Sequence, residues 1–499
     1  MRLAGSPNQH PMRLPVRLLS ALAGLSLALA TTAQTEGPSF TVTGAGIATT
    51  LASDYQSIGI NPANLGWDLK YEDPRFVFGL LEGAYSIHTT GVSRKVLRKD
   101  MLRDFDRTFT GNEQAAAADN FGQADLALNA DMRLLGFSFL NDDAGGFAIS
   151  IGDRFQWDSY YNGTTSDLLF LGRRAPYFTH LELADGTVIA NRPDLGADTL
   201  ALVRRGFVEP GEGLRISQLM GDTRMTLSWT REYAFSWGRR LFTTGTVEWH
   251  GGIGFRYLQG FAHIDIGEKD GRWQAFSALS PVFDVDYGTA AASNPSTVGG
   301  SGLRSVGRGF SGDVGISAVY KDRLKVGVAA TGLGSMTWDG NAYSAKDDTL
   351  YTLDSPGFTS YNFFDQAEVI TSELGILNWE GLAEKRVATP GLLRVGASYV
   401  VPDKAEVGID MVLPLNDVPG TIARPQFSVG GEYSPVKFLT LQAGVVTGGN
   451  YDTRLPMGLL FRLPSGQWEG GFASRDMLSF FSQDTPTVSL AMGILRFRI

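Results

Sequence analysis

The side chains of this chain that could carry out chemistry are few and far apart. The five histidines are His10, His88, His180, His250 and His263, and their spacing matches no metal-binding motif. No Gly-x-Ser-x-Gly elbow and no Gly-Lys-Ser/Thr phosphate loop is present. The chain has no cysteine, which excludes disulfides, thiolate metal sites and cysteine nucleophiles. We therefore expect no catalytic residue, no bound metal and no cofactor.

One hydrolytic alternative stays open. His250 and His263 fall on the polar side of alternating segments, with serines nearby, and a serine–histidine pair on strands could hydrolyse a lipid ester. The simpler interpretation is that both histidines line a polar interior. The same polar side carries five charged residues that we take as lumen-facing candidates: Arg256, Arg394, Glu406, Asp410 and Glu432. They would form an interior ion-pair network or, alternatively, line a solute path.

Alternating segments of sequence must position these charges. Residues 394–413 read RVGASYVVPDKAEVGIDMVL, with an apolar or aromatic residue at every second position and small, polar or charged residues between. Pro402-Asp403 interrupts the alternation, which predicts two strands joined by a short turn. A soluble sandwich or a transmembrane barrel could contain such a hairpin, because each has one apolar and one polar face.

Several features of the whole chain favour the barrel. Predicted turns after Tyr320, Val401, Tyr433 and Leu463 are short, whereas the connections at the other end are long, as in outer-membrane barrels. Apolar-side aromatics lie near strand ends, and the chain finishes on an alternating strand that ends at Ile499. Beyond the N-terminus no apolar run approaches the roughly 20 residues of a membrane helix. The net charge of −9 argues against a nucleic-acid partner.

The number of alternating segments does not fit a closed antiparallel barrel. About fifteen segments alternate, among them Phe76–Thr89 and Trp273–Tyr287, but antiparallel closure with both ends on one side needs an even number. One segment is therefore not a barrel strand, and we place the error between Phe76 and Trp237. The prediction is an all-β transmembrane antiparallel barrel of about 14 strands, with 16 as the alternative.

The chain divides into three predicted parts. Residues 1–33 form a signal peptide, with arginines before an apolar core and small residues at the cleavage site. Residues 34–75 are an N-terminal plug or hatch segment or, more plainly, a loop that leads into the first strand. Residues 76–499 are the barrel, with inserts at about 160–222 and 336–390 that are too long for plain loops. Asp185-Gly186 predicts a hairpin inside the first insert.

A helix is predicted at Val92–Phe109, capped by Ser93. Its apolar stripe runs from Val96 to Phe109, and its other face carries several arginines and lysines. Such a basic amphipathic helix could touch a membrane surface. The plainer interpretation is a helix that packs on the barrel end and turns a solvated basic face outward.

Residues 54–66, DYQSIGINPANLG, resemble the NPA-x-L signature of the FadL-like outer-membrane barrels. That superfamily includes long-chain fatty-acid and hydrocarbon transporters and the PorV-like components of type IX secretion. The stretches at 254–260, 331–338 and 408–416 add a resemblance to a poorly characterised branch found in Bacteroidota-type bacteria. The resemblance implies an N-terminal segment that plugs the lumen, with Asn61, Pro62 and Ala63 as plug or gate candidates.

The resemblance also implies a location and two alternative functions. The protein would be a multi-pass protein of a Gram-negative outer membrane, in contact with its lipid and inserted by the barrel-assembly machinery. As a channel, it would take a hydrophobic or amphipathic small molecule. As a PorV-like barrel, it would instead bind a partner protein through its external loops.

Overall fold

The computed structural model describes residues 39–67, 76–141, 143–269, 272–362, 376–449, 451–481 and 486–499. The predicted signal peptide, residues 1–33, lies outside the described residues, as do both ends of the predicted plug segment. No helix of the described chain has the length and apolar character to cross a membrane.

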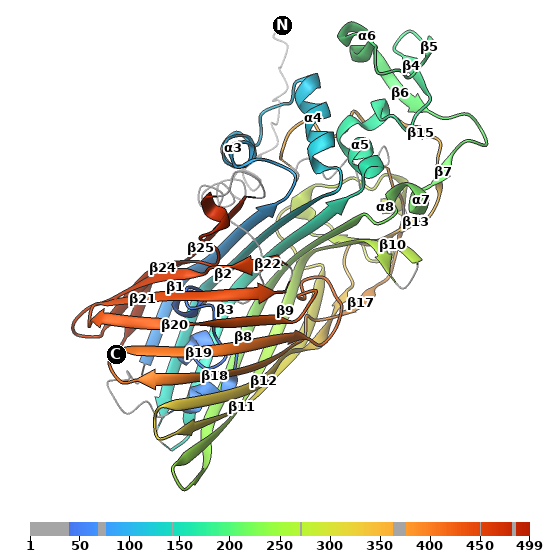
Figure 1. The fold of residues 1–499 in the computed structure, drawn as a ribbon. Coiled ribbons are helices and arrows are strands. Elements are labelled where there is room, and N and C mark those ends of the chain that lie inside the picture. The colour runs from blue at the N-terminus through green and yellow to red at the C-terminus, as the bar shows by residue number, and fades with distance from the viewer. Residues whose placement is uncertain are drawn as a thin grey trace, which may run out of the picture.

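Fourteen antiparallel strands of the described chain close into a barrel (Figure 1). Register pairs from Val77↔Arg498 to His88↔Thr487 join the first strand to the last, so the ring has no free edge. The predicted all-β barrel of 14 strands is therefore confirmed. In order around the ring the strands are β1 (Phe76–Thr89), β2 (Ala124–Asn141), β3 (Gly145–Tyr161), β8 (Arg224–Thr244), β9 (Val247–Lys269), β11 (Gly307–Tyr320), β12 (Leu324–Trp338), β18 (Leu392–Val401), β19 (Ala405–Pro414), β20 (Gln426–Val436), β21 (Leu439–Gly448), β23 (Met457–Arg462), β24 (Trp468–Ser474) and β25 (Thr487–Arg498).

The segment that does not belong to the ring is the predicted strand Trp273–Tyr287, so the expected position of the error was wrong. Only its first part forms a strand, β10 (Arg272–Leu279), and a 3₁₀ turn, η5 (Pro281–Phe283), follows. β9 is long enough to pair with β11 along Val247–Gly260 and with β10 further on. Alternation cannot reveal this arrangement, because a strand beyond the ring has the same period as one within it.

Short strands extend the sheet at the end where the long loops lie. β10 pairs with β13, β13 with β16, β12 with β17, and β21 with β22. At the opposite end the strands are joined by short turns, such as residues 245–246 between β8 and β9. The predicted asymmetry of the two ends is therefore present. The additional strands are β13 (Ala342–Lys346), β16 (Asn378–Gly381), β17 (Lys385–Ala388) and β22 (Tyr451–Arg454).

The hairpin of β18 and β19 shows how the wall is built. Val407 and Ile409 are 55% and 57% exposed and point outward, whereas Arg394 and Asp410 are 2% and 6% exposed and point inward. Similar outward apolar residues recur on both neighbours, as at Val326 on β12 and Val429 on β20. The outer wall is therefore a belt of exposed hydrocarbon around a polar interior, as a lipid-embedded barrel requires.

The long connections fold into an ordered cap at the loop end (Figure 1). Their apolar side chains form one large buried cluster with residues of the strand ends, including Leu168, Phe170, Met225 and Ile266. The Asp185-Gly186 hairpin is confirmed, with β4 and β5 paired across it. The cap elements are α4 (Gly111–Phe121), α5 (Gly163–Leu171), η4 (Gly172–Arg174), β4 (His180–Leu183), β5 (Val188–Ala190), α6 (Ala197–Ala201), β6 (Val203–Phe207), β7 (Leu214–Arg215), α7 (Ile216–Met220), α8 (Thr289–Ala292), β14 (Thr349–Leu350) and β15 (Thr352–Leu353).

The predicted helix Val92–Phe109 is shorter than expected. Ser93 accepts a hydrogen bond from the Val96 amide, as predicted, and α3 (Arg94–Val96) leads directly into a π-helical turn, η3 (Leu97–Met101). The helical backbone ends after this turn, although Leu102 and Phe109 still pack against the same apolar cluster as Leu97. The helix α4, which follows it, was not predicted; Thr110 and Glu113 form its capping box.

Candidate functional site

Residues 39–67, which we call the plug segment, lie inside the barrel (Figure 1). Three short helical pieces give the segment its shape: α2 (Phe40–Thr43), η1 (Asp54–Ser57) and η2 (Pro62–Gly66). α2 contacts β23, β24, β25 and β1, whereas η2 contacts β3, β8, β9 and β11 on another part of the wall. The plug segment therefore crosses the lumen from one side of the ring to the other.

The Asn61-Pro62-Ala63 turn is fully enclosed. Asn61 Oδ1 accepts a hydrogen bond from the Ala63 amide at 3.1 Å, and Pro62 begins η2 with its fixed φ. Asn64 Nδ2 donates to the carbonyl oxygens of Thr49 and Ala52, at 3.0 and 2.8 Å, and ties the turn to the rest of the plug segment. The structure thus places all three predicted gate candidates in the lumen, and all three are buried.

Glycines on the barrel wall make room for the plug segment. A β-carbon on Gly252 or Gly238 would overlap the backbone of Pro62, and one on Gly315 would overlap Asn61 Oδ1. The same is true around the ring at Gly79, Gly136, Gly146, Gly396, Gly430, Gly444, Gly458 and Gly493, each against a plug or neighbouring wall atom. Close backbone approach of this kind is a recognised reason for glycine within strands. It accounts for part of the high glycine content of the chain.

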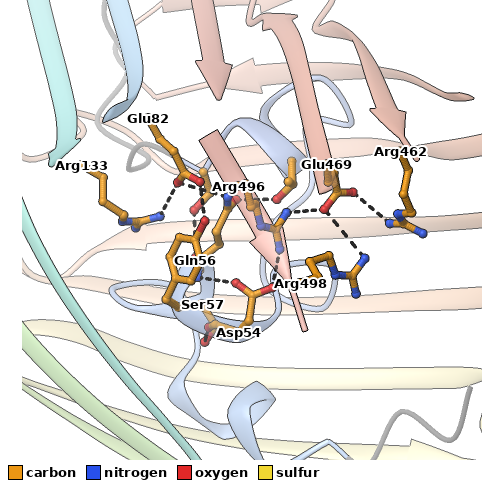
Figure 2. A network of polar contacts seen from close by, with 12 residues as sticks. Asp54, Gln56, Ser57, Glu82, Arg133, Arg462, Glu469, Arg496 and Arg498 are labelled. Carbon is orange, nitrogen blue, oxygen red and sulfur yellow. Dashed lines mark hydrogen bonds and ion pairs between the residues drawn. The ribbon is translucent and has the colours of Figure 1, made fainter. Parts of the chain in front are cut away.

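An ion-pair network fastens one side of the plug segment (Figure 2). Arg496 on β25 pairs with Asp54 of η1 through Nη2 and with Glu469 of β24 through Nη1, the latter at 2.5 Å. Arg462 and Arg498 also face Glu469, at 2.9 and 3.8 Å. Because Asp54, Glu469 and Arg496 are nearly excluded from solvent, each charge depends on its partners for stabilisation.

Tyr55 extends the same network toward β1 and β2. Its hydroxyl donates to Glu82 Oε1, while Gln56 Nε2 donates to Glu82 Oε2 at 3.2 Å. Arg133 lies 3.4 Å from the same carboxylate and 5.3 Å from the centre of the Tyr55 ring. Glu82 is fully buried, so its charge is compensated by Arg133 and by two hydrogen bonds from the plug segment.

The opposite side of the plug segment is held by β11, β12 and β19. Asp410 Oδ2 accepts hydrogen bonds from the amides of Ala48 and Thr49, at 2.6 and 2.8 Å. Trp67 Nε1 donates to the Ser317 hydroxyl at 2.9 Å. The Lys325 ammonium lies 4.7 Å from the Trp67 ring centre and pairs with Glu406 at 2.9 Å. The plug segment is therefore held by polar contacts on both sides, and Phe40, Ile58 and Leu65 add apolar contacts with the wall.

The five predicted lumen-facing residues all point inward, but they do not pair with one another. Arg256 pairs with Asp313 at 2.5 Å and with Glu232 at 3.4 Å. Glu406 binds Lys325, Glu432 accepts from Gln442 at 3.2 Å, and Asp410 binds the plug backbone. Within the described chain, Arg394 Nε and Nη1 have no hydrogen-bond partner. The interior ion pairs of Arg256 and Glu406 therefore involve partners outside these five, and a solute path lined by the five stays a prediction.

Sequence reasoning missed the residues that hold the plug segment most directly. Glu82, Arg133 and Glu469 occupy inward positions of strands, and Asp54 lies in the plug segment itself. Arg496 lies on the polar side of the last strand. The available signal was a charged residue on the polar side of an otherwise apolar strand, but alternation does not reveal which strands are neighbours in the ring.

The two histidines with nearby serines are buried in the wall. His250 stands opposite Ser317 in the ladder, and the Ser317 hydroxyl accepts the hydrogen bond from Trp67. His263 stacks on Trp338, with ring centres 4.9 Å apart, and neither of its ring nitrogens has a hydrogen-bond partner in the described chain. The geometry therefore assembles no serine–histidine pair at His263.

The cap at the loop end of the barrel packs mainly through apolar side chains. Residues of α5, α7, β3, β8 and β9 enclose a small cavity of about 20 Å³. Its lining is largely apolar and consists of Tyr161, Thr165, Leu168, Leu169, Met220, Thr223, Met225, Ile266, Ile376 and Leu377. A cavity this small holds at most one water molecule, so the cap packs tightly on the strand ends at this point.

A closed, lipid-compatible barrel with an internal plug is the class of protein that these features define. Residues 190–467 match the model of a family of unknown function (DUF5723), and the chain belongs to that family. No curated protein matches the chain in sequence.

Several solved barrels are similar to this structure. The toluene transporter TodX of Pseudomonas putida is 10% identical, with 94% of this chain and 97% of that chain covered and a TM-score of 0.41. The toluene transporter TbuX of Ralstonia pickettii is 12% identical, with 92% and 97% covered and a TM-score of 0.40. A Pseudomonas aeruginosa FadL homologue is 12% identical, with 94% and 97% covered and a TM-score of 0.36. The Bacteroidota-type branch stays a prediction.

Proposed function

We propose that this protein is an outer-membrane channel for hydrophobic or amphipathic small molecules, and that the plug segment controls its lumen. The observation that carries this proposal is the plug segment, which crosses the lumen of a barrel with an apolar outer belt and is held to the wall by hydrogen bonds and ion pairs. The exposed apolar belt supports a location in lipid, where the barrel-assembly machinery would insert the chain.

The apolar cluster of the cap suits the capture of a hydrophobic solute. Leu168, Met225 and Ile266 line the small cavity, and the surrounding cluster offers apolar surface that a solute could share after local movement of the cap. Transfer of hydrocarbon from water to such a surface is favourable by roughly 25 cal/mol per Å². A site there would therefore select by hydrophobicity rather than by a fixed set of hydrogen bonds.

The polar contacts between the plug segment and the wall suit reversible opening of the lumen. Hydrogen bonds from Ala48, Thr49 and Tyr55 to wall carboxylates can be exchanged for hydrogen bonds to water at a modest net cost, about 0.5–3 kcal/mol each. Asn61, Pro62 and Ala63 would act in this gate as the rigid turn that fits between the wall glycines.

Deletion of Phe40–Trp67 tests the channel directly. The purified variant, reconstituted in liposomes, should admit small solutes faster than the parent in a swelling assay. Deletion of the hairpin tip Asp185–Thr187, which lies in the cap and far along the chain from the plug, is the control and should leave the flux unchanged. Heat-modifiable migration of each variant shows that the barrel has assembled. An assembled deletion variant with the flux of the parent would contradict the proposal.

A partner-binding role is the second candidate, and one observation favours it. A separate four-stranded sheet, in the order β15-β6-β4-β5, projects beyond the rest of the cap (Figure 1). Within the described chain its edge strand β5 pairs with β4 alone and exposes Val188, so an extended segment of another protein could add to it. The Arg205–Asp354 pair stiffens this sheet, and Arg205 lowers the pKa of the Asp354 carboxyl. Stoichiometric co-purification of a protein that depends on β5 would favour this role.

A further inference from the structure

The connection between β1 and α4 carries an unusual concentration of positive charge. Five cations in ten residues, Arg94, Lys95, Arg98, Lys99 and Arg103, line one open groove of about 470 Å³. The π-helical turn η3 lies in the middle of this segment, and such turns occur frequently at functional sites. The five side chains thus face a common hollow instead of spreading around a regular helix.

Most of this charge is not compensated. Within the described chain, no carboxylate lies within 4.0 Å of Lys95 or Arg98, and the Lys99 ammonium is 4.0 Å from Asp100. Arg103 pairs with Asp104 at 2.9 Å, and Arg94 Nη1 donates to the carbonyl oxygen of Phe480 at 3.2 Å. Lys95, Arg98 and Lys99 are exposed, so they are available to an anion from outside.

The groove lies on the outer side of the barrel wall. Glu82 and Ala84 on β1 face the plug segment, so Ile87 faces outward by alternation. Ile87 is nevertheless only 3% exposed, and it shares a buried cluster with Val92, Leu97 and Met101. The segment therefore packs its apolar side near the outer wall at the loop end, where a lipid headgroup region would lie.

Exposed apolar side chains stand beside the groove. The Arg94–Phe480 hydrogen bond brings the segment next to the loop before β25, which contains η6 (Ser479–Phe481). In that loop Leu478 is 56% and Phe481 is 65% exposed. Figure 1 shows α3 and this loop close together on the same flank of the barrel. Cations next to exposed aromatic and aliphatic residues are the combination found at membrane interfaces.

We propose that Arg94, Lys95, Arg98, Lys99 and Arg103 bind the phosphate groups of a phosphorylated lipid in the outer leaflet, with Leu478 and Phe481 against its acyl chains. Arginine and lysine both recognise phosphate, and neighbouring apolar contacts distinguish a lipid phosphate from a free one. This inference rests on the outer-membrane location in the proposed function, but it does not require that the barrel transport a solute.

Lipid binding by the full-length protein in detergent micelles tests the site. The probe is lipid A with both phosphates. The variant Lys95→Gln/Arg98→Gln/Lys99→Gln should bind it about tenfold or more weakly, because three cations near an anionic headgroup are lost. Increasing salt should weaken the parent more than this variant. The matched control, Lys321→Gln/Arg323→Gln/Lys404→Gln, removes three exposed cations at the short-turn end and should bind like the parent.

Two results would overturn the site. One is a groove variant that binds within about twofold of the parent, and the other is an equal loss in the control variant. Dephosphorylated lipid A should bind parent and groove variant alike; selective loss there would contradict phosphate recognition. Inorganic pyrophosphate that bound as tightly as lipid A would contradict the lipid assignment. Because swelling assays measure the channel separately, intact flux with failed lipid binding overturns this inference alone.

Discussion

The plug segment and the cap pack on the same barrel with different chemistry. The plug segment contacts the wall through ion pairs and hydrogen bonds, as at Asp54–Arg496 and Ala48–Asp410, and fits against glycines. The cap packs on the strand ends with aromatic and aliphatic side chains, as where Phe170 stacks on Phe121 with ring centres 5.4 Å apart. The plug segment is therefore held by directional contacts together with two small apolar clusters, and the cap by apolar packing.

This difference matters for how the plug segment and the cap can move. A polar contact that breaks in the presence of water is replaced by contacts to water, so its net contribution is small even where its geometry is good. Apolar packing has no such replacement, but it accepts a solute that is itself apolar. We therefore expect the plug segment to respond to substitutions of charge and space, and the cap to respond to changes in cavity volume.

The largest effect is expected from Gly252→Leu. A side chain at this position would overlap the Pro62 backbone, so the plug segment cannot stay in place without distorting β9. Residues 39–67 should lose protection from hydrogen exchange and the solute flux should rise, while the cap keeps its protection. Gly299→Leu is the control, because nothing lies within 4 Å of a β-carbon there. Unchanged protection of the plug segment would show that the wall glycines are not needed for its fit.

A somewhat smaller effect is expected from Arg496→Met. The substitution leaves the Asp54 carboxylate buried without its cation, and loss of one partner from a buried pair costs about 3–5 kcal/mol. Hydrogen exchange should show a destabilised plug segment in an assembled barrel. Arg240→Met removes the partly exposed pair with Glu248 and should cost less than about 1 kcal/mol. Equal exchange in the two variants would mean that the ion pairs do not hold the plug segment.

Leu168→Ala probes the cap. Leu168 is 1% exposed and lines the small apolar cavity, so truncation should destabilise the cap by about 2–5 kcal/mol and enlarge the cavity. Benzene or a similar apolar probe should then stabilise the variant more than the parent in thermal unfolding. The plug segment should keep its exchange protection. Leu202→Ala, at a 54% exposed site in the same insert, should change neither property. If Leu168→Ala also lowered the hydrogen-exchange protection of the plug segment, the plug segment and the cap would be coupled.

Local pattern accounts for much of the fold. β1 begins and ends at Phe76 and Thr89 as predicted, and the β18–β19 hairpin has the faces that its alternation indicates. Period-2 alternation works here because each strand of the ring has one side toward the polar interior and one toward the apolar surroundings. The same signal failed for Trp273–Tyr287 because pairing, not periodicity, decides whether a strand joins the ring.

The candidate site divides in the same way. The sequence by itself determined the closed barrel of alternating strands, the short and long ends, and the inward side of Arg256, Arg394, Glu406, Asp410 and Glu432, because all of these follow from local period and turn chemistry. Only the tertiary structure decided their partners. Asp54 and Arg496 are 442 positions apart in sequence, and ring closure brings them together. The closed ring likewise decides which glycines face the plug segment. The fold of the loops decides which cations share the groove at 94–103. Neither property can be derived from any single strand.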